Sequence, residues 1–574
     1  MIKRLAKSIR EYKKESILSG IFIIIEVIME VLIPLIMAYL IDKGINASNA
    51  SAIYKSSFLL ILVAIISLIS GILASKYASI ASGGFAKNLR HDMYYKIQDF
   101  SFSNIDKFQT SSLVTRLTTD VSYIQNAYMM IIRTALRSPL MLIFSLISAF
   151  YINSKVALIY IGIIPFLAGA LFLIANIAHP KFKAVFETYD ELNTDVQENV
   201  RGIRVVKSYV KEEYEKKKFG RISSLIYERF SKAEKIVAWN MPAMQFSMYT
   251  CRLLIAWFAA KLIISGSMTT GQLTSLLSYA GGILSSLMML SMIYVMTIIS
   301  ATSAERINEV LSENSDITNK EKPVMDVIDG SIEFKNVNFS YSKKKNKLVL
   351  KNVNLKIKSG EVIGIIGGTG SSKTTLISLI NRLYDVTDGE VILSNVNVKD
   401  YDLKVLRDSV SVVLQKNVLF SGTIIDNMRW GNEDATLDEI KEACHLACAD
   451  QFISELPNEY EYVLDQGGTN VSGGQKQRLC IARALLKKPK VLILDDSTSA
   501  VDTKTDAIIR TNLSKYMPEV TKIIIAQRIA SVENADRVIV MDKGEVVAFD
   551  TPEKLLKTNK IYKEVYDSQT KGVM

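Results

Sequence analysis

Histidine and cysteine are scarce in this sequence. Its 574 residues include three histidines and four cysteines, which are His91, His179, His445, Cys251, Cys444, Cys448 and Cys480. This small and scattered set excludes a disulfide framework, and no second pair completes a zinc-binding set beside Cys444 and Cys448. The N-terminus also lacks a signal-peptide pattern, because its first apolar run is too long and no small-residue cleavage site follows it.

Apolar residues are abundant and unevenly distributed. Hydrophobic residues make up 49% of the chain and charged residues 22%, which excludes a disordered protein. The formal net charge is +11, and lysine and arginine gather beside apolar runs, as in "MIKRLAKSIREYKK" at the N-terminus. Basic flanks of this kind face anionic lipid head groups on the cytoplasmic side of a membrane. We therefore expect membrane lipid as a partner of this chain, and no nucleic acid.

The first half of the chain contains six apolar runs. A helix needs about 20 apolar residues to cross the hydrocarbon core of a bilayer. The runs that qualify lie approximately at residues 16–42, 55–82, 128–153, 156–179, 236–265 and 272–302. Two long links between them are rich in charge, which places them in the cytoplasm by the positive-inside rule. The sequence thus predicts a transmembrane domain at 1–318 with six helices, two long cytoplasmic loops and a cytoplasmic N-terminus.

Several ionisable residues interrupt the predicted spans. They are Glu26, Glu30, Arg133, Arg137 and Arg252. A charge inside the hydrocarbon is costly, so each of these side chains should face a cavity, a partner or a helix end. The pattern fits a polar transport pathway and structural pairing equally well, and the sequence leaves both open.

The residues after about Ser331 show strand-like alternation and then a glycine-rich loop. The apolar strand Val362–Ile366 runs into a loop that matches the pattern G-x-x-x-x-G-K-[ST] at all of its fixed positions but one, and a helix comes next. The predicted phosphate-binding residues are Gly367, Gly368, Thr369, Gly370, Ser371, Ser372, Lys373, Thr374 and Thr375. Lys373 can reach the phosphate oxygens of ATP and Thr374 can bind Mg²⁺. The second glycine of the pattern is replaced by Ser372, which puts a Cβ where the backbone must come close.

A second phosphate-binding element precedes an acidic strand end. "VSGGQ" lies at a predicted loop-to-helix junction and supplies Ser472, Gly473, Gly474 and Gln475, and "VLILDD" ends in Asp495 and Asp496. A serine hydroxyl, glycine amides and a helix N-terminus together favour a phosphate group. One chain cannot easily aim both helix starts at the same phosphate. A head-to-tail dimer solves this, with each nucleotide between the glycine-rich loop of one chain and the SGGQ of the other.

This combination resembles an ATP-binding cassette (ABC) exporter half-transporter over essentially the whole chain. The resemblance implies an α-helical six-span domain followed, at 319–574, by an α/β P-loop nucleotide-binding domain with an α-helical subdomain. It implies that Tyr341 stacks on adenine, that Asp495 holds Mg²⁺, and that Gln415 senses Mg²⁺ and the attacking water. Asp502 in "SAVD" resembles the loop that communicates between two sites. Short coupling helices are expected near residues 109–116 and 199–208.

Two further positions depart from the family's catalytic set. Asp496 stands where the family has a glutamate that polarises water, and an aspartate is shorter by about 1.5 Å. Gln527 stands where the family has a histidine that contacts the γ-phosphate, and none of the three histidines of the chain follows the acidic strand. Loss of a general base typically costs about 10²–10⁴ in rate. The sequence therefore predicts a site that binds Mg-ATP and hydrolyses it poorly, with Asp496 and Gln527 as the altered members of a catalytic set that also contains Gln415.

The retained SGGQ predicts a heterodimer. In a head-to-tail dimer it would complete the site of a second half-transporter subunit, which would supply the missing glutamate and histidine. The expected function is export of hydrophobic or amphipathic small molecules, as in multidrug exporters, from the cytoplasm across a bacterial inner (plasma) membrane. The alternatives are a lipid or peptide exporter subunit, and a regulatory or channel-like subunit that binds ATP without driving transport.

Overall fold

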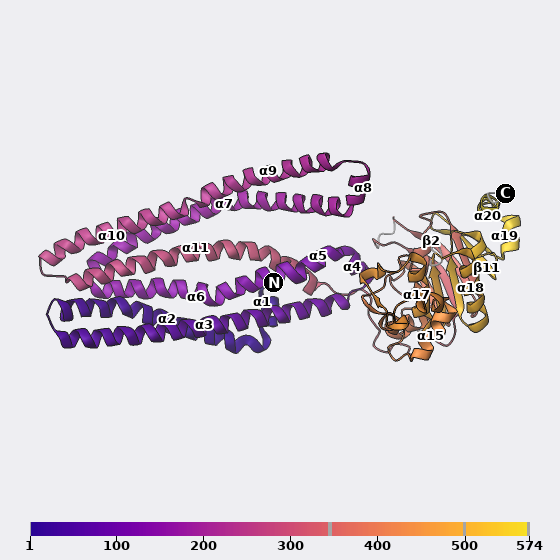
Figure 1. Ribbon diagram of the computed structural model, residues 1–574, viewed down its shortest axis with the longest axis horizontal. Coiled ribbons are helices and arrows are strands. Elements are labelled where there is room, and N and C mark those ends of the chain that lie inside the picture. Colours follow the sequence, from indigo (N-terminus) through magenta and orange to yellow (C-terminus); the bar gives the residue numbers. More distant parts are fainter. Residues whose placement is uncertain (1, 343–346, 497–500, 571–574) are drawn as a thin grey trace. The chain divides into compact units, whose positions relative to one another are not determined.

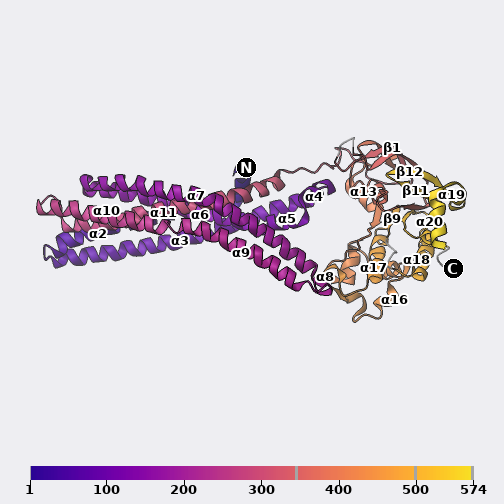
Figure 2. The same cartoon turned by 90° about the horizontal axis from the view of Figure 1, so that it is seen from above.

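The chain forms two compact units, and each is described by itself. The computed structural model describes residues 2–342, 347–496 and 501–570. The first unit contains the residues up to Asp99 together with Gln109–Glu313. The second contains Phe100–Phe108 together with the residues from Asn314 onward (Figures 1 and 2). The sequence placed the junction between residues 318 and 319, and it assigned the segment 100–108 to the membrane domain.

The first unit is built from long helices that lie side by side (Figure 1). Its helical segments are α1 (Ile2–Leu5), η1 (Ala6–Tyr12), α2 (Lys13–Tyr39), η2 (Leu40–Ile45), α3 (Ala50–Gln98), α5 (Thr110–Thr115), η3 (Arg116–Asp120), α6 (Val121–Ile152), α7 (Ser154–Arg201), α8 (Ile203–Ser208), α9 (Glu212–Val237), α10 (Asn240–Ile264) and α11 (Thr270–Ser312). Among the described residues, six helical stretches are long and apolar enough to cross a membrane, which confirms the predicted number.

These helices continue well past the apolar runs. Helix α3 has 49 residues and α7 has 48. At a rise of about 1.5 Å per residue, each is roughly 70 Å long, against about 30 Å for the hydrocarbon core of a bilayer. A large part of each charged link is therefore a helical extension of a span. The turns between spans are short because polar residues cap the next helix: the side chain of Asn153 accepts hydrogen bonds from the backbone N–H of Lys155 and Val156.

The second unit contains a six-stranded sheet and a four-stranded sheet. The strands are β1 (Ile332–Phe339), β2 (Leu350–Ile357), β3 (Val362–Gly367), β4 (Asp388–Leu393), β5 (Val396–Asn397), β6 (Val410–Val413), β7 (Gly422–Thr423), β8 (Val463–Leu464), β9 (Val491–Asp495), β10 (Thr521–Ile525), β11 (Arg537–Asp542) and β12 (Glu545–Asp550). The larger sheet has the order β12-β11-β3-β10-β9-β6, and the smaller has the order β2-β1-β4-β5. Strands β7 and β8 form a separate pair.

The larger sheet is parallel from β11 to β6, and only its edge strand β12 runs antiparallel. The carboxyl ends of β3, β10, β9 and β6 consequently meet at one edge of the sheet, which is where ligands bind in open α/β folds. Strands β9 and β10 are buried along their whole length. Buried strands of this kind give continuous apolar runs such as "VLIL", rather than an alternating pattern.

Helices complete the second unit, in agreement with the predicted fold class. They are α4 (Phe102–Phe108), α12 (Lys373–Ser378), α13 (Leu403–Ser409), α14 (Ile424–Arg429), α15 (Leu437–Leu446), α16 (Asp450–Ile453), η4 (Glu459–Glu461), η5 (Gln466–Gly468), α17 (Gly473–Leu485), α18 (Thr503–Tyr516), η6 (Ile529–Ser531), α19 (Pro552–Thr558) and α20 (Lys560–Thr570). Helices α14–α17 lie between β7 and β9 in the sequence and form the predicted helical subdomain.

Candidate nucleotide-binding site

The glycine-rich loop connects β3 to α12. Gly367 is the last residue of β3, and a Cβ at this position would come 2.3 Å from the backbone oxygen of Met541. Gly370 has a φ of +81°, in the left-handed region that glycine adopts without steric cost. Ser372 has a φ of 75° and a ψ of 26°, so it is left-handed as well. A residue with a Cβ adopts this conformation at a cost of roughly 1–2 kcal/mol. Having serine rather than glycine at position 372 therefore lowers stability through the backbone conformation of the loop.

The ammonium group of Lys373 is folded back onto this loop. Its Nζ donates hydrogen bonds to the carbonyl oxygens of Gly367 and Gly368, both at 2.9 Å. Burial lowers the pKa of Lys373, while the charges of Asp495 and Asp496 oppose that shift. The loop and the lysine thus surround a small region at the start of α12, where the first N–H groups of a helix attract a phosphate.

Thr374 and Asp495 present two oxygen atoms to the same point. The Oγ1 of Thr374 donates a hydrogen bond to the Oδ2 of Asp495 at 3.0 Å. Burial at the end of β9 raises the pKa of Asp495, and the hydrogen bond from Thr374 opposes the shift. Neighbouring ligands of an octahedral Mg²⁺ lie about 2.9 Å apart when each is 2.0–2.1 Å from the ion. The spacing and the chemistry of this pair therefore fit Mg²⁺.

Asp496 is held between two glutamine amides. Its Oδ2 accepts a hydrogen bond from the Nε2 of Gln527 at 2.9 Å and from the Nε2 of Gln415 at 3.3 Å. The three residues follow β9, β10 and β6, whose carboxyl ends lie side by side in the sheet. The structure thus brings the three predicted catalytic residues together. Gln415 contacts Asp496 here rather than the Thr374–Asp495 pair.

Tyr341 lies beside the glycine-rich loop and its helix. The hydroxyl group of Tyr341 is hydrogen-bonded to the Oγ1 of Thr375 at 2.9 Å. Its ring makes edge contacts with Phe339 and Tyr384, at centroid distances of 4.9 and 5.1 Å. Despite these contacts, the residue is 48% exposed. A half-exposed ring at this position is suited to stack on a base.

Tyr384 connects this aromatic group to α4, and the sequence interpretation missed it. The hydroxyl group of Tyr384 donates a hydrogen bond to the Oδ2 of Asp106 at 2.7 Å, and its ring lies 6.1 Å from that of Phe102. Burial and the carboxylate of Asp106 raise the pKa of Tyr384. Helix α4, Phe102–Phe108, belongs to the second unit and ends just before the predicted first coupling helix at 109–116, which stays a prediction. Helix α8, Ile203–Ser208, falls inside the other predicted range.

The SGGQ residues form the start of α17. Ser472 caps this helix: its Oγ accepts a hydrogen bond from the N–H of Gln475, and the Oε1 of Gln475 accepts one from the N–H of Ser472, at 3.3 and 2.8 Å. Ser472 and Gly473 are exposed. Within the residues that the structure describes, no hydrogen bond joins this helix start to the glycine-rich loop of the same chain.

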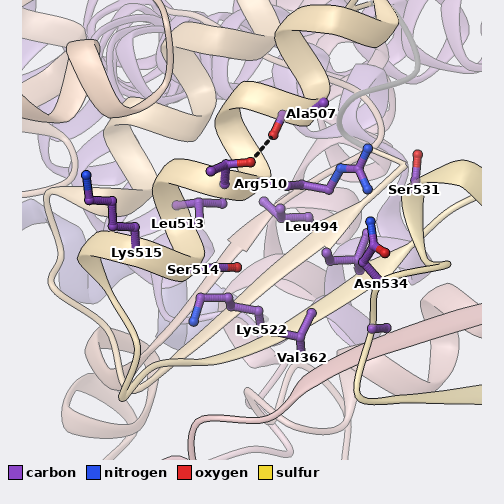
Figure 3. Close-up of a pocket in the computed structure, with 13 residues that line it drawn as sticks. Val362, Leu494, Ala507, Arg510, Leu513, Ser514, Lys515, Lys522, Ser531 and Asn534 are labelled. Atoms are coloured by element: carbon purple, nitrogen blue, oxygen red, sulfur yellow. Dashed lines mark hydrogen bonds between the residues drawn. The ribbon is translucent and has the colours of Figure 1, made fainter. Parts of the chain in front are cut away.

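A cavity of about 510 Å³ lies elsewhere in the second unit, between α18 and the larger sheet (Figure 3). Its lining includes Arg510, Lys515 and Lys522 and none of the predicted nucleotide-binding residues. The ammonium group of Lys522 donates to the carbonyl oxygens of Met517 and Val520, just past the end of α18. This lysine thus has a structural role at the carboxyl end of that helix.

In the first unit, the structure pairs three of the ionisable residues. The Nη2 of Arg137, on α6, donates to both carboxylate oxygens of Glu30, on α2, at 2.7 Å. The Nε of Arg137 lies 3.4 Å from an oxygen of Glu26. These ion pairs fit the structural alternative for Glu26, Glu30 and Arg137.

The fold and the site together define a membrane protein whose long helices are fused to a domain built to bind a nucleoside triphosphate. The ABC transporter transmembrane region matches residues 16–310, and the ABC transporter domain matches residues 350–499. The chain therefore belongs to the ABC transporter family, with the organisation of an exporter half-transporter. It is a multi-pass membrane protein, and its nucleotide-binding domain implies ATP binding and ATPase-coupled transport.

Similar proteins agree with this assignment. The chain is 36% identical to the uncharacterized ABC transporter ATP-binding protein YfiB of Bacillus subtilis, over 98% of both chains. It is 32% identical to the ATP-dependent lipid A-core flippase of Desulfotalea psychrophila, over 89% of both chains. A solved structure of a bacterial Atm1-family ABC exporter with ATP bound has a TM-score of 0.86, and the match covers 97% of this chain and 99% of that one. Since the identity there is 19%, this likeness concerns the fold.

Proposed function

We propose that this chain is the subunit of a heterodimeric exporter whose own nucleotide site binds Mg-ATP but hydrolyses it slowly. The proposal is supported above all by the surroundings of Asp496. Its carboxylate faces the side-chain amides of Gln415 and Gln527. An amide can donate a hydrogen bond, but it cannot carry the charge of an imidazolium or shuttle a proton. A shortened acid between two amides is therefore poorly equipped to activate water.

The binding residues of the same site are retained, which separates binding from hydrolysis. Lys373 and the first amides of α12 would hold the phosphates. Thr374 and Asp495 would hold Mg²⁺, which supplies charge neutralisation at the phosphates. Tyr341 would stack on the base. Gln527 would hold the γ-phosphate through a hydrogen bond, at a site where catalysis depends on positioned charge.

The exposed start of α17 is proposed to serve the partner's nucleotide. Ser472 and Gly473 are exposed and Gly474 is partly exposed at this helix start, and the first N–H groups of a helix have no acceptor within the helix. In a head-to-tail dimer this surface would close the partner subunit's site, where the partner would supply the glutamate and the histidine that this chain lacks. Export would then depend on hydrolysis at that site, in a bacterial inner membrane with the N-terminus and the nucleotide-binding domain in the cytoplasm.

Heterodimer formation can be tested by comparing the chain alone with the chain co-expressed with candidate partners. The chain is purified in lipid both by itself and after co-expression with candidate half-transporters from the same genome. We expect weak ATPase activity from the chain alone, and activity higher by about 10²-fold or more in one co-purified complex, because a competent general base is then present. Robust transport-coupled ATPase activity of the chain alone would contradict the proposal.

For the transported compound, we propose hydrophobic or amphipathic molecules, and the relatives favour a lipid as a second candidate. One relative over 89% of the chain is named as a lipid A-core flippase. The two candidates are distinguished in vesicles that contain the assembled transporter. ATP-dependent uptake of a fluorescent hydrophobic cation supports a multidrug-type exporter, whereas ATP-dependent movement of a labelled phospholipid between leaflets supports a flippase.

A further inference from the structure

The loop that carries Gln527 is held from two sides by helices outside the nucleotide site. It begins directly after β10 and continues into η6. Helix α18 holds the far end of the loop: the Nη1 of Arg510 donates to the carbonyl oxygen of Ala530 at 2.9 Å, and the Oγ of Ser531 donates to the Oδ2 of Asp506 at 3.3 Å. Arg510 and Asp506 are themselves paired at 3.1 Å.

Helix α20 holds the near end of the loop through one side chain. The Nε2 of Gln569 donates to the carbonyl oxygen of Gln527 at 2.8 Å, and the N–H of Ile529 donates to the Oε1 of Gln569 at 2.8 Å. A single primary amide thus bonds both a backbone acceptor and a backbone donor across Arg528. Because the donor and acceptor of an amide have a fixed separation, this pair of bonds fixes the local geometry of the loop more tightly than one bond would.

Helix α20 is anchored to the body of the domain, so it can act as a rigid support. Tyr562 is 1% exposed and belongs to the apolar core, against which Ile561 and Val565 also pack. Gln569 lies four residues after Val565, one turn further along the same face of the helix. The C-terminal helices α19 and α20 are seen together beside the sheet in Figure 1.

The effect of this clamp reaches the acidic edge of the site through Gln527. Gln569 fixes the backbone carbonyl of Gln527, while the side chain of Gln527 donates to Asp496 at 2.9 Å. We infer that Gln569 is a positioning residue, which sets the Gln527 loop against the nucleotide site from the C-terminal helix. Its consequence for nucleotide binding rests on the proposed role of Gln527 toward the γ-phosphate.

The clamp itself is tested by amide hydrogen exchange in the full-length chain, purified in lipid. Gln569→Ala removes both bonds, and we expect the Ile529 amide to exchange at least about 5-fold faster, the equivalent of one lost hydrogen bond. Gln569→Glu keeps an acceptor for Ile529 and loses the donor to Gln527, so the Ile529 amide should stay protected. Ser568→Ala, on the same turn of α20, is the control. Unchanged exchange at Ile529 in Gln569→Ala would overturn the inference.

Its functional consequence is tested by titrating Mg-ATP and Mg-ADP, with exchange of the peptide 362–375 reporting on this chain's own site. We expect Gln569→Ala to raise the half-saturating ATP concentration by about 3–10-fold and to leave that of ADP unchanged, because ADP lacks the γ-phosphate. In a Gln527→Ala background, Gln569→Ala should have no further effect. If Gln569→Ala weakened the binding of ATP and ADP equally, Gln569 would have a merely structural role. The same would follow if it weakened ATP binding further in the Gln527→Ala background.

The two proposals fail in distinguishable ways. If Gln527→Ala alone leaves the preference for ATP over ADP unchanged, the proposed role of Gln527 toward the γ-phosphate is wrong. The exchange rate of the Ile529 amide still decides whether Gln569 positions the loop.

Discussion

The two predicted phosphate-binding regions of this nucleotide-binding domain differ in how they match the family pattern. The edge formed by the glycine-rich loop and the ends of β9 and β10 departs at Ser372, Asp496 and Gln527. The start of α17 departs nowhere, and its capping box is complete. Both regions depend on a helix N-terminus, but the first also needs side chains that move protons, whereas the second needs a hydroxyl and backbone amides. Under the proposed function, the first region keeps binding and the second keeps a role in the partner's catalysis.

The largest effect is expected at the second region. Ser472→Ala removes the hydroxyl that would face the partner's nucleotide, and we expect ATPase activity of the assembled transporter to fall by about 10²-fold, as for the loss of one oriented donor. Thr436→Ala is the matched control, because Thr436 caps α15 with the same type of capping box. Both changes should cost about 1 kcal/mol of stability. Equal effects of the two variants on steady-state ATP hydrolysis would contradict the proposed role of the SGGQ.

A smaller gain is expected from restoring the first region. The double variant Asp496→Glu/Gln527→His returns a longer carboxylate and an imidazole to the site, and we expect hydrolysis by this chain's own site to rise by up to about 10²-fold. Each single variant should give a smaller rise in hydrolysis, since the general base and the histidine that contacts the γ-phosphate act together. Phosphate release by the chain purified alone is the measurement, with Asp496→Asn as the negative control. If the double variant and both single variants hydrolysed ATP at the rate of the unmodified chain, the degenerate-site proposal would lose its main support.

The smallest effect is expected at Ser372, where serine replaces the glycine of the family pattern and only the backbone conformation is affected. Ser372→Gly relieves the left-handed strain, and we expect about 1 kcal/mol of added stability, a rise of roughly 2–4 °C in the thermal transition of the nucleotide-binding domain. Calorimetry of the full chain measures it. Ser371→Gly is the control, because Ser371 is 4% exposed and has an ordinary φ, so glycine there should destabilise. A lower transition temperature for Ser372→Gly would show that the serine side chain makes a compensating contact.

Much of the site was predictable because its residues are close in sequence or follow strand ends. The run Gly367–Thr375 is contiguous. Asp495 ends one buried apolar strand of a parallel sheet and Gln527 comes two residues after the end of the next, so their meeting at one edge follows from the strand order. Tyr384 and Gln569 had no such signal. Their partners Asp106 and Ile529 are 278 and 40 positions away in the sequence, and a single tyrosine or glutamine in a sequence does not indicate a partner at such a distance.

By itself, the sequence determined the six spans, the α/β domain after them and the glycine-rich loop predicted to hold phosphate, because hydrophobic length, strand alternation and motif spacing are properties of neighbouring residues. Only the tertiary structure decided that Ser372 is left-handed, that Asp496 lies between two amides, that the segment 100–108 belongs with the nucleotide-binding unit, and that the C-terminal helix clamps the Gln527 loop. Each of these depends on which distant backbone and side-chain atoms meet. The physical reason is that hydrogen-bond geometry and backbone strain are set by packing across the fold, which local residue patterns do not encode.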